Sequence, residues 1–200
     1  LMDLEKGAAR LARAIREGIG HDGRALYWGM WYQSFAPLSD EDLAAVVVYL
    51  RTLPPVRNAL PPTQLPADEQ VANARSPQPI TAPVAGPAPG DTKALGRYLI
   101  GVADCTGCHS AWEAPRNPGL LAGGNEIVRG TRAAFSSNLT RHESGVAYPK
   151  DTFIAVMRTG KGESLHSIMP WTAFSGLTDQ DLGAIYDALG DVYPVAHYVG

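Results

Sequence analysis

The chain has 200 residues, of which 45% are hydrophobic, and a formal net charge of −3 at pH 7. That is enough material for one ordinary domain or two small ones of about 100 residues each. Its lysines and arginines form no basic stripe, which argues against nucleic acid or an anionic membrane surface as a partner. The longest apolar run, LAAVVVYL, is far shorter than the roughly 20 residues needed to cross a bilayer.

The first 52 residues have a helical pattern. Apolar residues recur at the spacing of one helix face, first within residues 11–15 and again within residues 43–50. The opening stretch, LMDLEKGAARLARAIREG, lacks the basic start, apolar middle and cleavage site of a secretion signal. Since Leu1 is not a translation start, we expect the natural precursor to extend further at this end.

The next segment is rich in proline. Residues 53–90 contain ten of the 16 prolines in the chain, too many for a helix or a central strand. This composition predicts an extended connector between two domains. Residues 91–200 then resume helical patterning, with loops rich in Gly, Asn and Ser and a final helix from Asp179 to about Gly190.

An internal repeat links the two helical regions. When Met30 is aligned with Met169, the downstream residues are identical at nine further positions without a gap, from Phe35 and Phe174 to Val56 and Val195. Ser39 and Thr178 occupy matching positions, and each is a good helix N-cap with an Asp three residues later. Each methionine is therefore predicted to lie on a loop nine residues before a capped, amphipathic helix.

One motif carries specific chemistry. The run CTGCH, Cys105 to His109, has the spacing of a c-type haem attachment site, in which two thiols bind the haem vinyl groups and the adjacent imidazole becomes the proximal iron ligand. A thioredoxin-like dithiol would need a strand and helix around the motif, and a zinc site would need a second pair of ligands. The sequence shows neither context, so we expect covalent haem c at Cys105, Cys108 and His109.

A low-spin cytochrome needs a sixth ligand, and Met169 is the best-placed candidate. It lies 60 residues after His109, in a loop between two helices, and Pro170 follows it. A methionine that merely fills a gap in the core is one alternative. Ligation by His166 after a loop rearrangement is the other.

The C-terminal region resembles a known family. Residues 92–197, with GRYLIGVADCTGCH, LLAGG, SSNLT, MRTG and MPWTAFSGLTDQDLGAIYDAL, resemble a class I cytochrome c domain of the cytochrome subunits of periplasmic alcohol, gluconate and related dehydrogenases. The resemblance implies that the helix before CTGCH crosses the C-terminal helix. It also implies that haem propionates are bound by some of four residues: Asn138, Arg129, Arg132 and Trp171. The stretch NLTRHESGVA departs from the family pattern of Asn-x-Thr-Pro-Asp followed by Gly-Ile-Gly.

Residues 8–56 resemble the back half of the same kind of domain. Three accounts are open: the front half with a further Cys-x-x-Cys-His lies outside this sequence, the domain has lost its haem, or another chain supplies the front half. The first is favoured because two helices and a loop cannot close a core alone. It makes Met30 the distal ligand of a second haem whose attachment motif lies upstream of Leu1. Trp31 stands where Pro would be expected after the methionine.

These patterns predict an all-α protein with tandem class I cytochrome c domains, the first incomplete at its N-terminus. Residues 1–56 would be the C-terminal half of the first domain, residues 57–90 a Pro-rich linker and residues 91–200 a complete domain. We expect a periplasmic electron-transfer cytochrome, without bond chemistry of its own, between a dehydrogenase and a quinone- or oxidase-linked acceptor, with membrane association only through a partner or a missing segment. A peroxidase-like haem enzyme and a haem-based sensor with a labile distal methionine are the alternatives.

Overall fold

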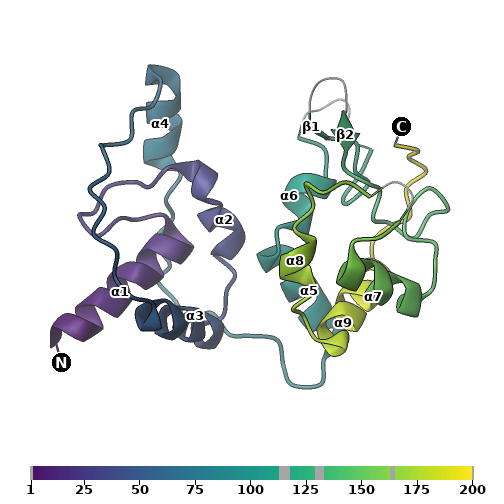
Figure 1. Ribbon diagram of the computed structural model, residues 1–200, viewed down its shortest axis with the longest axis horizontal. Helices are drawn as coiled ribbons and strands as arrows, with labels where there is room; N and C mark the ends of the chain where they lie inside the picture. Colours follow the sequence, from purple (N-terminus) through teal and green to yellow (C-terminus); the bar gives the residue numbers. More distant parts are fainter. Residues whose placement is uncertain (1, 113–117, 129–132, 163–164, 200) are drawn as a thin grey trace. The chain divides into compact units, whose positions relative to one another are not determined.

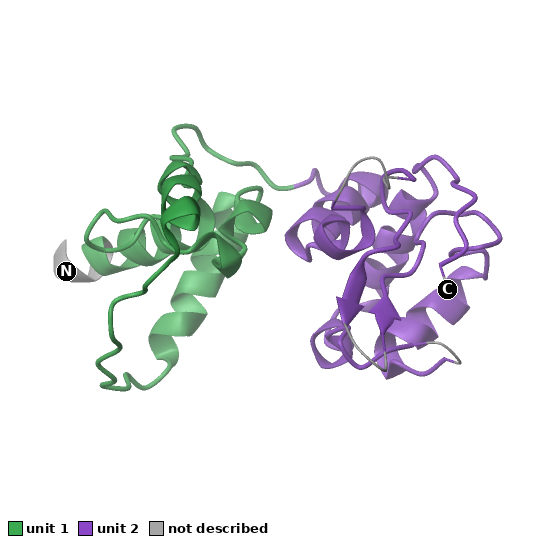
Figure 2. Cartoon of the chain, turned by 90° about the horizontal axis from the view of Figure 1, so that it is seen from above, with its two compact units in different colours: residues 1–86 green, residues 87–200 purple. Residues whose placement is uncertain are grey.

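The computed structural model describes residues 2–112, 118–128, 133–162 and 165–199. The chain divides into two compact units, residues 1–86 and 87–200, which Figure 2 colours separately. The predicted boundaries at residues 56 and 90 differ from this division because part of the Pro-rich segment folds with the first unit. No helix in the described part of the chain is both long and apolar enough to cross a membrane.

The first unit contains the helices α1 (Met2–Glu17), α2 (Tyr32–Phe35), α3 (Asp40–Thr52) and α4 (Ala67–Arg75), with a short 3₁₀ turn, η1 (Trp28–Met30). Helix α1 packs against α2 and α3. The Ser39 hydroxyl accepts the backbone N–H of Asp42, which caps α3 as predicted. The buried apolar side chains described in this unit are Tyr32, Leu43 and Val47, so its core is small.

Helix α4 corrects the expectation of an uninterrupted extended connector. The nine residues Ala67–Arg75 contain no proline, and Pro66 stands at the N-cap, a place where its missing N–H costs no hydrogen bond. The Asn73 side-chain oxygen accepts the backbone N–H of Trp28 at 2.9 Å, and Val84 O accepts the backbone N–H of Asp40 at 2.9 Å. The prolines therefore flank a helix, and the segment folds back onto its own unit.

The second unit contains α5 (Thr92–Val102), α6 (Cys105–His109), α7 (Lys150–Thr159), α8 (Trp171–Phe174) and α9 (Asp179–Leu189). Two short strands, β1 (Glu126–Val128) and β2 (Ala134–Phe135), pair antiparallel, an addition to the predicted all-α fold, which is otherwise mostly helical as expected. Figure 1 shows α5 and α9 lying against each other. They approach closely because Gly96 has no side chain: a Cβ there would collide with the Ala184 carbonyl and the Ala188 methyl group.

The core of the second unit gathers around this crossing. Phe153, Met157 and Phe174 pack with apolar residues of α5 and α9, and Cys105, Met169 and Trp171 pack against the cluster from its edge. The N-cap predicted for α9 is present and forms a full capping box, because Thr178 and Asp181 exchange side-chain to backbone hydrogen bonds. The fold thus brings the start of the unit, the CTGCH helix and the Met169 loop to one core.

Candidate functional site

The CTGCH motif forms its own short helix, α6. The helix follows a sharp change of direction at Asp104, whose backbone is left-handed with φ 55°. Gly107 gives the Asp104 carboxylate room to lie over the helix, because a Cβ at that position would collide with it. The motif's two cysteines and its histidine are therefore held on one turn and a half of helix.

His109 is buried and its ring is oriented by one hydrogen bond. Its Nδ1 lies 2.7 Å from the carbonyl oxygen of Ser137. Since a carbonyl can only accept, Nδ1 carries the proton and Nε2 keeps its lone pair, the form that binds a metal. Burial lowers the pKa of His109, against an opposing effect of the Ser137 carbonyl, so the ring stays neutral.

The loop that supplies Ser137 is tied closely to the histidine. Gly123 N donates to His109 O at 2.6 Å. Gly123 has φ +70°, and its missing side chain lets the backbone of Ser136 and Ser137 approach. The glycines of LLAGG therefore bring the accepting carbonyl to the ring.

Both cysteines are free thiols in environments that keep them protonated. Burial raises the pKa of Cys105 to about 12, and the nearby Asp104 carboxylate adds to the shift. Burial also raises the pKa of Cys108. No three His, Cys, Asp or Glu side chains gather as a metal cluster within the described residues.

Asn125 braces the motif, a role that the sequence did not reveal. Its side-chain nitrogen donates to Cys108 O at 2.8 Å and to Ser110 O at 2.6 Å, while its oxygen accepts the N–H of Trp112 at 3.0 Å. Its backbone N–H donates to Ser136 Oγ at 3.0 Å. No sequence pattern predicts this role for a single Asn that follows two glycines.

Met169 lies where the repeat predicts, at the end of a loop before α8. Its side chain is half-buried against the core, and its carbonyl accepts the N–H of Trp171 at 2.8 Å. His166, the alternative ligand, is exposed and its Nδ1 accepts the N–H of Ile168 at 3.0 Å. That bond places the ring proton on Nε2, so His166 would have to rearrange before binding a metal.

The four predicted propionate ligands stay predictions. The Asn138 side chain is buried and its nitrogen donates to Ser144 Oγ at 3.0 Å and Val195 O at 2.9 Å, which ties the C-terminal segment to the loop. Trp171 Nε1 donates to His166 O at 3.0 Å. Arg129 and Arg132 lie outside the described residues.

Met30 is 53% exposed, and the aromatic residues that neighbour it in sequence, Tyr27, Trp28 and Trp31, are exposed as well. Trp31 has a left-handed backbone with φ 59°. The Tyr32 hydroxyl beyond it is buried without a hydrogen-bond partner among the described residues. A buried hydroxyl without a partner costs about 1–3 kcal/mol.

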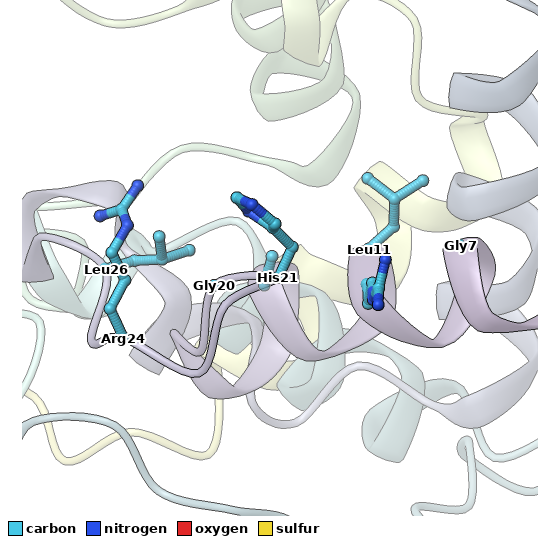
Figure 3. Close-up of a pocket in the computed structure, with 8 residues that line it drawn as sticks. Gly7, Leu11, Gly20, His21, Arg24 and Leu26 are labelled. Atoms are coloured by element: carbon cyan, nitrogen blue, oxygen red, sulfur yellow. The ribbon is translucent and has the colours of Figure 1, made fainter. Parts of the chain in front are cut away.

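One hollow is described in each unit, and the lining of neither includes Met30 or Met169. One, of about 330 Å³, lies between α1 and the turn that follows it, where Figure 3 shows Leu11 on the helix and His21, Arg24 and Leu26 on the turn. The other, of about 730 Å³, adjoins α6 at Thr106 and is bounded by residues 118–121 and 191–196.

Comparison with known proteins gives no matching family model, but it finds curated relatives. One of the subunits of nicotinate dehydrogenase from Pseudomonas putida is 30% identical over 96% of this chain and 16% of that protein. The fructose dehydrogenase cytochrome subunit of Gluconobacter japonicus is 29% identical over 92% of this chain and 40% of that protein. The gluconate 2-dehydrogenase cytochrome c subunit of Pantoea cypripedii is 28% identical over 84% of this chain and 40% of that protein. The chain is a relative of dehydrogenase cytochrome c subunits.

This relationship confirms the resemblance predicted from the motifs. The chain spans about two fifths of the length of the cytochrome subunits and a smaller share of the nicotinate dehydrogenase protein. The matched proteins are named as the cytochrome subunits of dehydrogenases. They therefore also support the expectation of an electron-transfer subunit rather than a catalyst.

Proposed function

We propose that the chain is an electron-transfer c-type cytochrome in which Cys105 and Cys108 would attach a haem and His109 and Met169 would bind its iron. The observation that carries the proposal is the His109 ring, which is buried on the CTGCH helix with Nδ1 committed to the Ser137 carbonyl and Nε2 left to bind iron. The bound haem supplies one-electron chemistry, since its iron alternates between the ferric and ferrous states.

The residues of the chain fit this role in three ways. The Ser137 carbonyl orients the proximal imidazole and increases its basicity. The apolar core around Met157, Phe174 and Leu182 excludes water from the site. A thioether as the second axial ligand favours ferrous iron and raises the reduction potential.

The location and the partners are proposed by analogy with the relatives. A periplasmic cytochrome would receive electrons from a dehydrogenase subunit, as the names of the relatives suggest, and pass them to a quinone- or oxidase-linked acceptor. Any association with a membrane would come through a partner or a segment outside this sequence.

Replacement of Met169 by Ala tests the ligand assignment. The variant should lose the sulfur-to-iron charge-transfer band and have a lower reduction potential, while the haem stays covalently attached. His166→Ala is the matched control and should change neither property. Persistence of the band in Met169→Ala would make Met169 a core residue. Tight carbon monoxide binding by the ferrous wild-type protein would favour the enzyme or sensor alternative, because a firm sixth ligand opposes it.

A second haem, bound at Met30, belongs to the same proposal. The apolar residues of α3 have the same spacing as those of α9, but most of the corresponding face of α3 is exposed to solvent. Val46 is 39% exposed, Tyr49 64% and Leu50 37%, whereas their counterparts Ile185, Ala188 and Leu189 are at most 3% exposed. In the second unit this face is covered by α5, the helix that leads into CTGCH.

An α5-like helix is therefore the cover that α3 lacks. It would need a glycine opposite Ala45, as Gly96 lies opposite Ala184 in the second unit. We place the corresponding Cys-x-x-Cys-His upstream of Leu1, outside this sequence.

Haem quantification on the natural full-length protein tests this part of the proposal. The expected ratio exceeds one haem per chain, and Met30→Ala should lower the potential of one haem while leaving the other unchanged. A ratio of one, with no c-type motif encoded upstream, would make Met30 a packing residue.

A further inference from the structure

The same ion pair spans the methionine loop in both units. In the second unit Arg158, in the last turn of α7, lies 2.7 Å from Asp179, the first residue of α9. In the first unit Arg16, in the last turn of α1, lies 2.7 Å from Asp40, the first residue of α3. Each arginine therefore ties together the two ends of the segment that contains the methionine.

Each of these arginines also holds the loop itself. Arg16 Nη1 donates to Leu38 O at 2.8 Å, and Arg158 Nη1 donates to Ser175 O. Both acceptors are backbone carbonyls of the stretch between the methionine and the following helix. One guanidinium thus binds both the loop and the helix start, as its forked geometry allows.

A glycine and an aromatic ring form the second tie. Two residues after each arginine, Gly18 and Gly160 have φ +70° and +59°, and a Cβ on either would lie 2.5 Å from a ring. The rings belong to Tyr32 and Trp171, each two residues after its methionine. We call the arginine, glycine, aromatic residue and aspartate of each unit the loop frame.

The frame is shared although the loops differ. Fourteen positions separate Arg16 from Met30 (30 − 16), whereas eleven separate Arg158 from Met169 (169 − 158). The residue after the methionine is Trp31 in one loop and Pro170 in the other. Loop length and the proline are therefore variable parts, and the frame is the feature common to both methionines.

We infer that the loop frame positions the methionine sulfur, with Arg158 and Arg16 as the positioning residues for Met169 and Met30. The inference rests on the proposed ligation of iron by methionine. A loop tied at both ends has fewer conformations in which the sulfur lies away from the iron. The frame, rather than Pro170, keeps the population of these detached conformations low.

Replacement of Arg158 by Ala in the haem-loaded full chain tests the inference. Loss of a partly exposed pair and its carbonyl bond should raise the detached population, and hence the affinity of the ferrous protein for carbon monoxide, about fivefold. The charge-transfer band should weaken and the reduction potential should fall. Arg158→Lys should restore part of each property, and Pro170→Ala should change them less than Arg158→Ala.

Lys150→Ala is the matched control. It removes an ion pair of 2.6 Å, to Asp187, that also joins α7 to α9 but does not span the loop. It should lower thermal stability without changing the band, the potential or carbon monoxide binding. Equal spectroscopic changes in both variants, or none in Arg158→Ala, would overturn the inference.

Asp179→Asn serves if Arg158→Ala does not fold, because the Asp179 side chain is mostly exposed. It should produce the same changes in smaller measure, and an unchanged band, potential and carbon monoxide affinity would again overturn the inference. Met169→Ala separates the two proposals. If that variant loses the band while both frame variants keep it, the ligand assignment stands and the frame alone is wrong.

Discussion

Helices α3 and α9 have the same apolar register but different surroundings. Each helix begins with an Asp that follows a capping Ser or Thr, and Leu43 and Leu182 are buried at matching positions. Helix α9 packs against both α5 and α7, whereas α3 packs against α1, the counterpart of α7. The covered helix buries its whole apolar face, and the other leaves most of that face in solvent.

This difference shows that an apolar helix face indicates that a partner should cover it but does not itself provide that partner. Helix α9 is buried because Gly96 of α5 allows the two backbones to approach. Helix α3 has the same small residue at the crossing position, Ala45, but no α5-like helix lies against it among the described residues of its unit.

The largest effect is expected at the helix crossing. Gly96→Ala places a Cβ against the Ala184 backbone carbonyl, which cannot move aside as a flexible side chain can. We expect loss of the folded second unit, measured as loss of its unfolding transition in circular dichroism. Gly101→Ala on the same helix is the control, because a Cβ there meets open space and should be tolerated. Equal stability of the two variants would show that the crossing is not as close as described.

The next effect concerns thiol reactivity in the haem-free chain. Burial raises the pKa of Cys105 from 9.0 to about 12, so its reactive thiolate is roughly a thousandfold scarcer than that of a free thiol at neutral pH. Alkylation of Cys105 should be slow between pH 7 and 10, and Cys108 should react faster, as peptide mass mapping would measure. Equally fast reaction of both thiols would mean that the α5 and α9 core does not form without haem.

Shortening side chains at matching positions of α9 and α3 should lower the free energy of unfolding by unequal amounts. Ile185→Ala removes a fully buried side chain and should lower the free energy of unfolding of the second unit by about 3 kcal/mol. Val46→Ala, at the matching position of α3, should cost less than about 1 kcal/mol in this chain because Val46 is partly in solvent. Urea titration measures both. A cost at Val46 in the full-length protein similar to that at Ile185 would show that α3 is covered there.

The smallest effect is expected in the segment that folds back onto the first unit. Asn73→Ala removes the acceptor of the Trp28 N–H and should lower the stability of the first unit by about 1 kcal/mol. The second unit should be unaffected, which separate unfolding transitions would show. Gln78→Ala is the control, because its side chain donates to the nearby exposed carbonyl of Arg75 and makes no other hydrogen bond among the described residues. No loss in Asn73→Ala would mean that α4 contributes nothing to the Met30 loop.

The features of the candidate site that could be predicted are those whose signals are local in sequence. CTGCH is a contiguous motif, and Ser39 and Thr178 cap helices that begin at the next residue. The Ser137 carbonyl lies 28 positions from His109, and the Asn125 side chain reaches Cys108 O from 17 positions away. Any residue has a backbone carbonyl, so no pattern marks the one that a fold brings to a histidine.

The sequence by itself determined the CTGCH run, the two methionine loops and the register of the helices that follow them, because each depends on spacing along one segment. Tertiary structure alone decided which ring nitrogen of His109 is free, how Arg158 and Gly160 frame the Met169 loop, and which apolar helix face is buried. These features depend on atoms from distant segments meeting at hydrogen-bond or van der Waals distance. Such meetings are set by the packing of α5 on α9 and of α7 on both the loop and α9, which no single segment encodes.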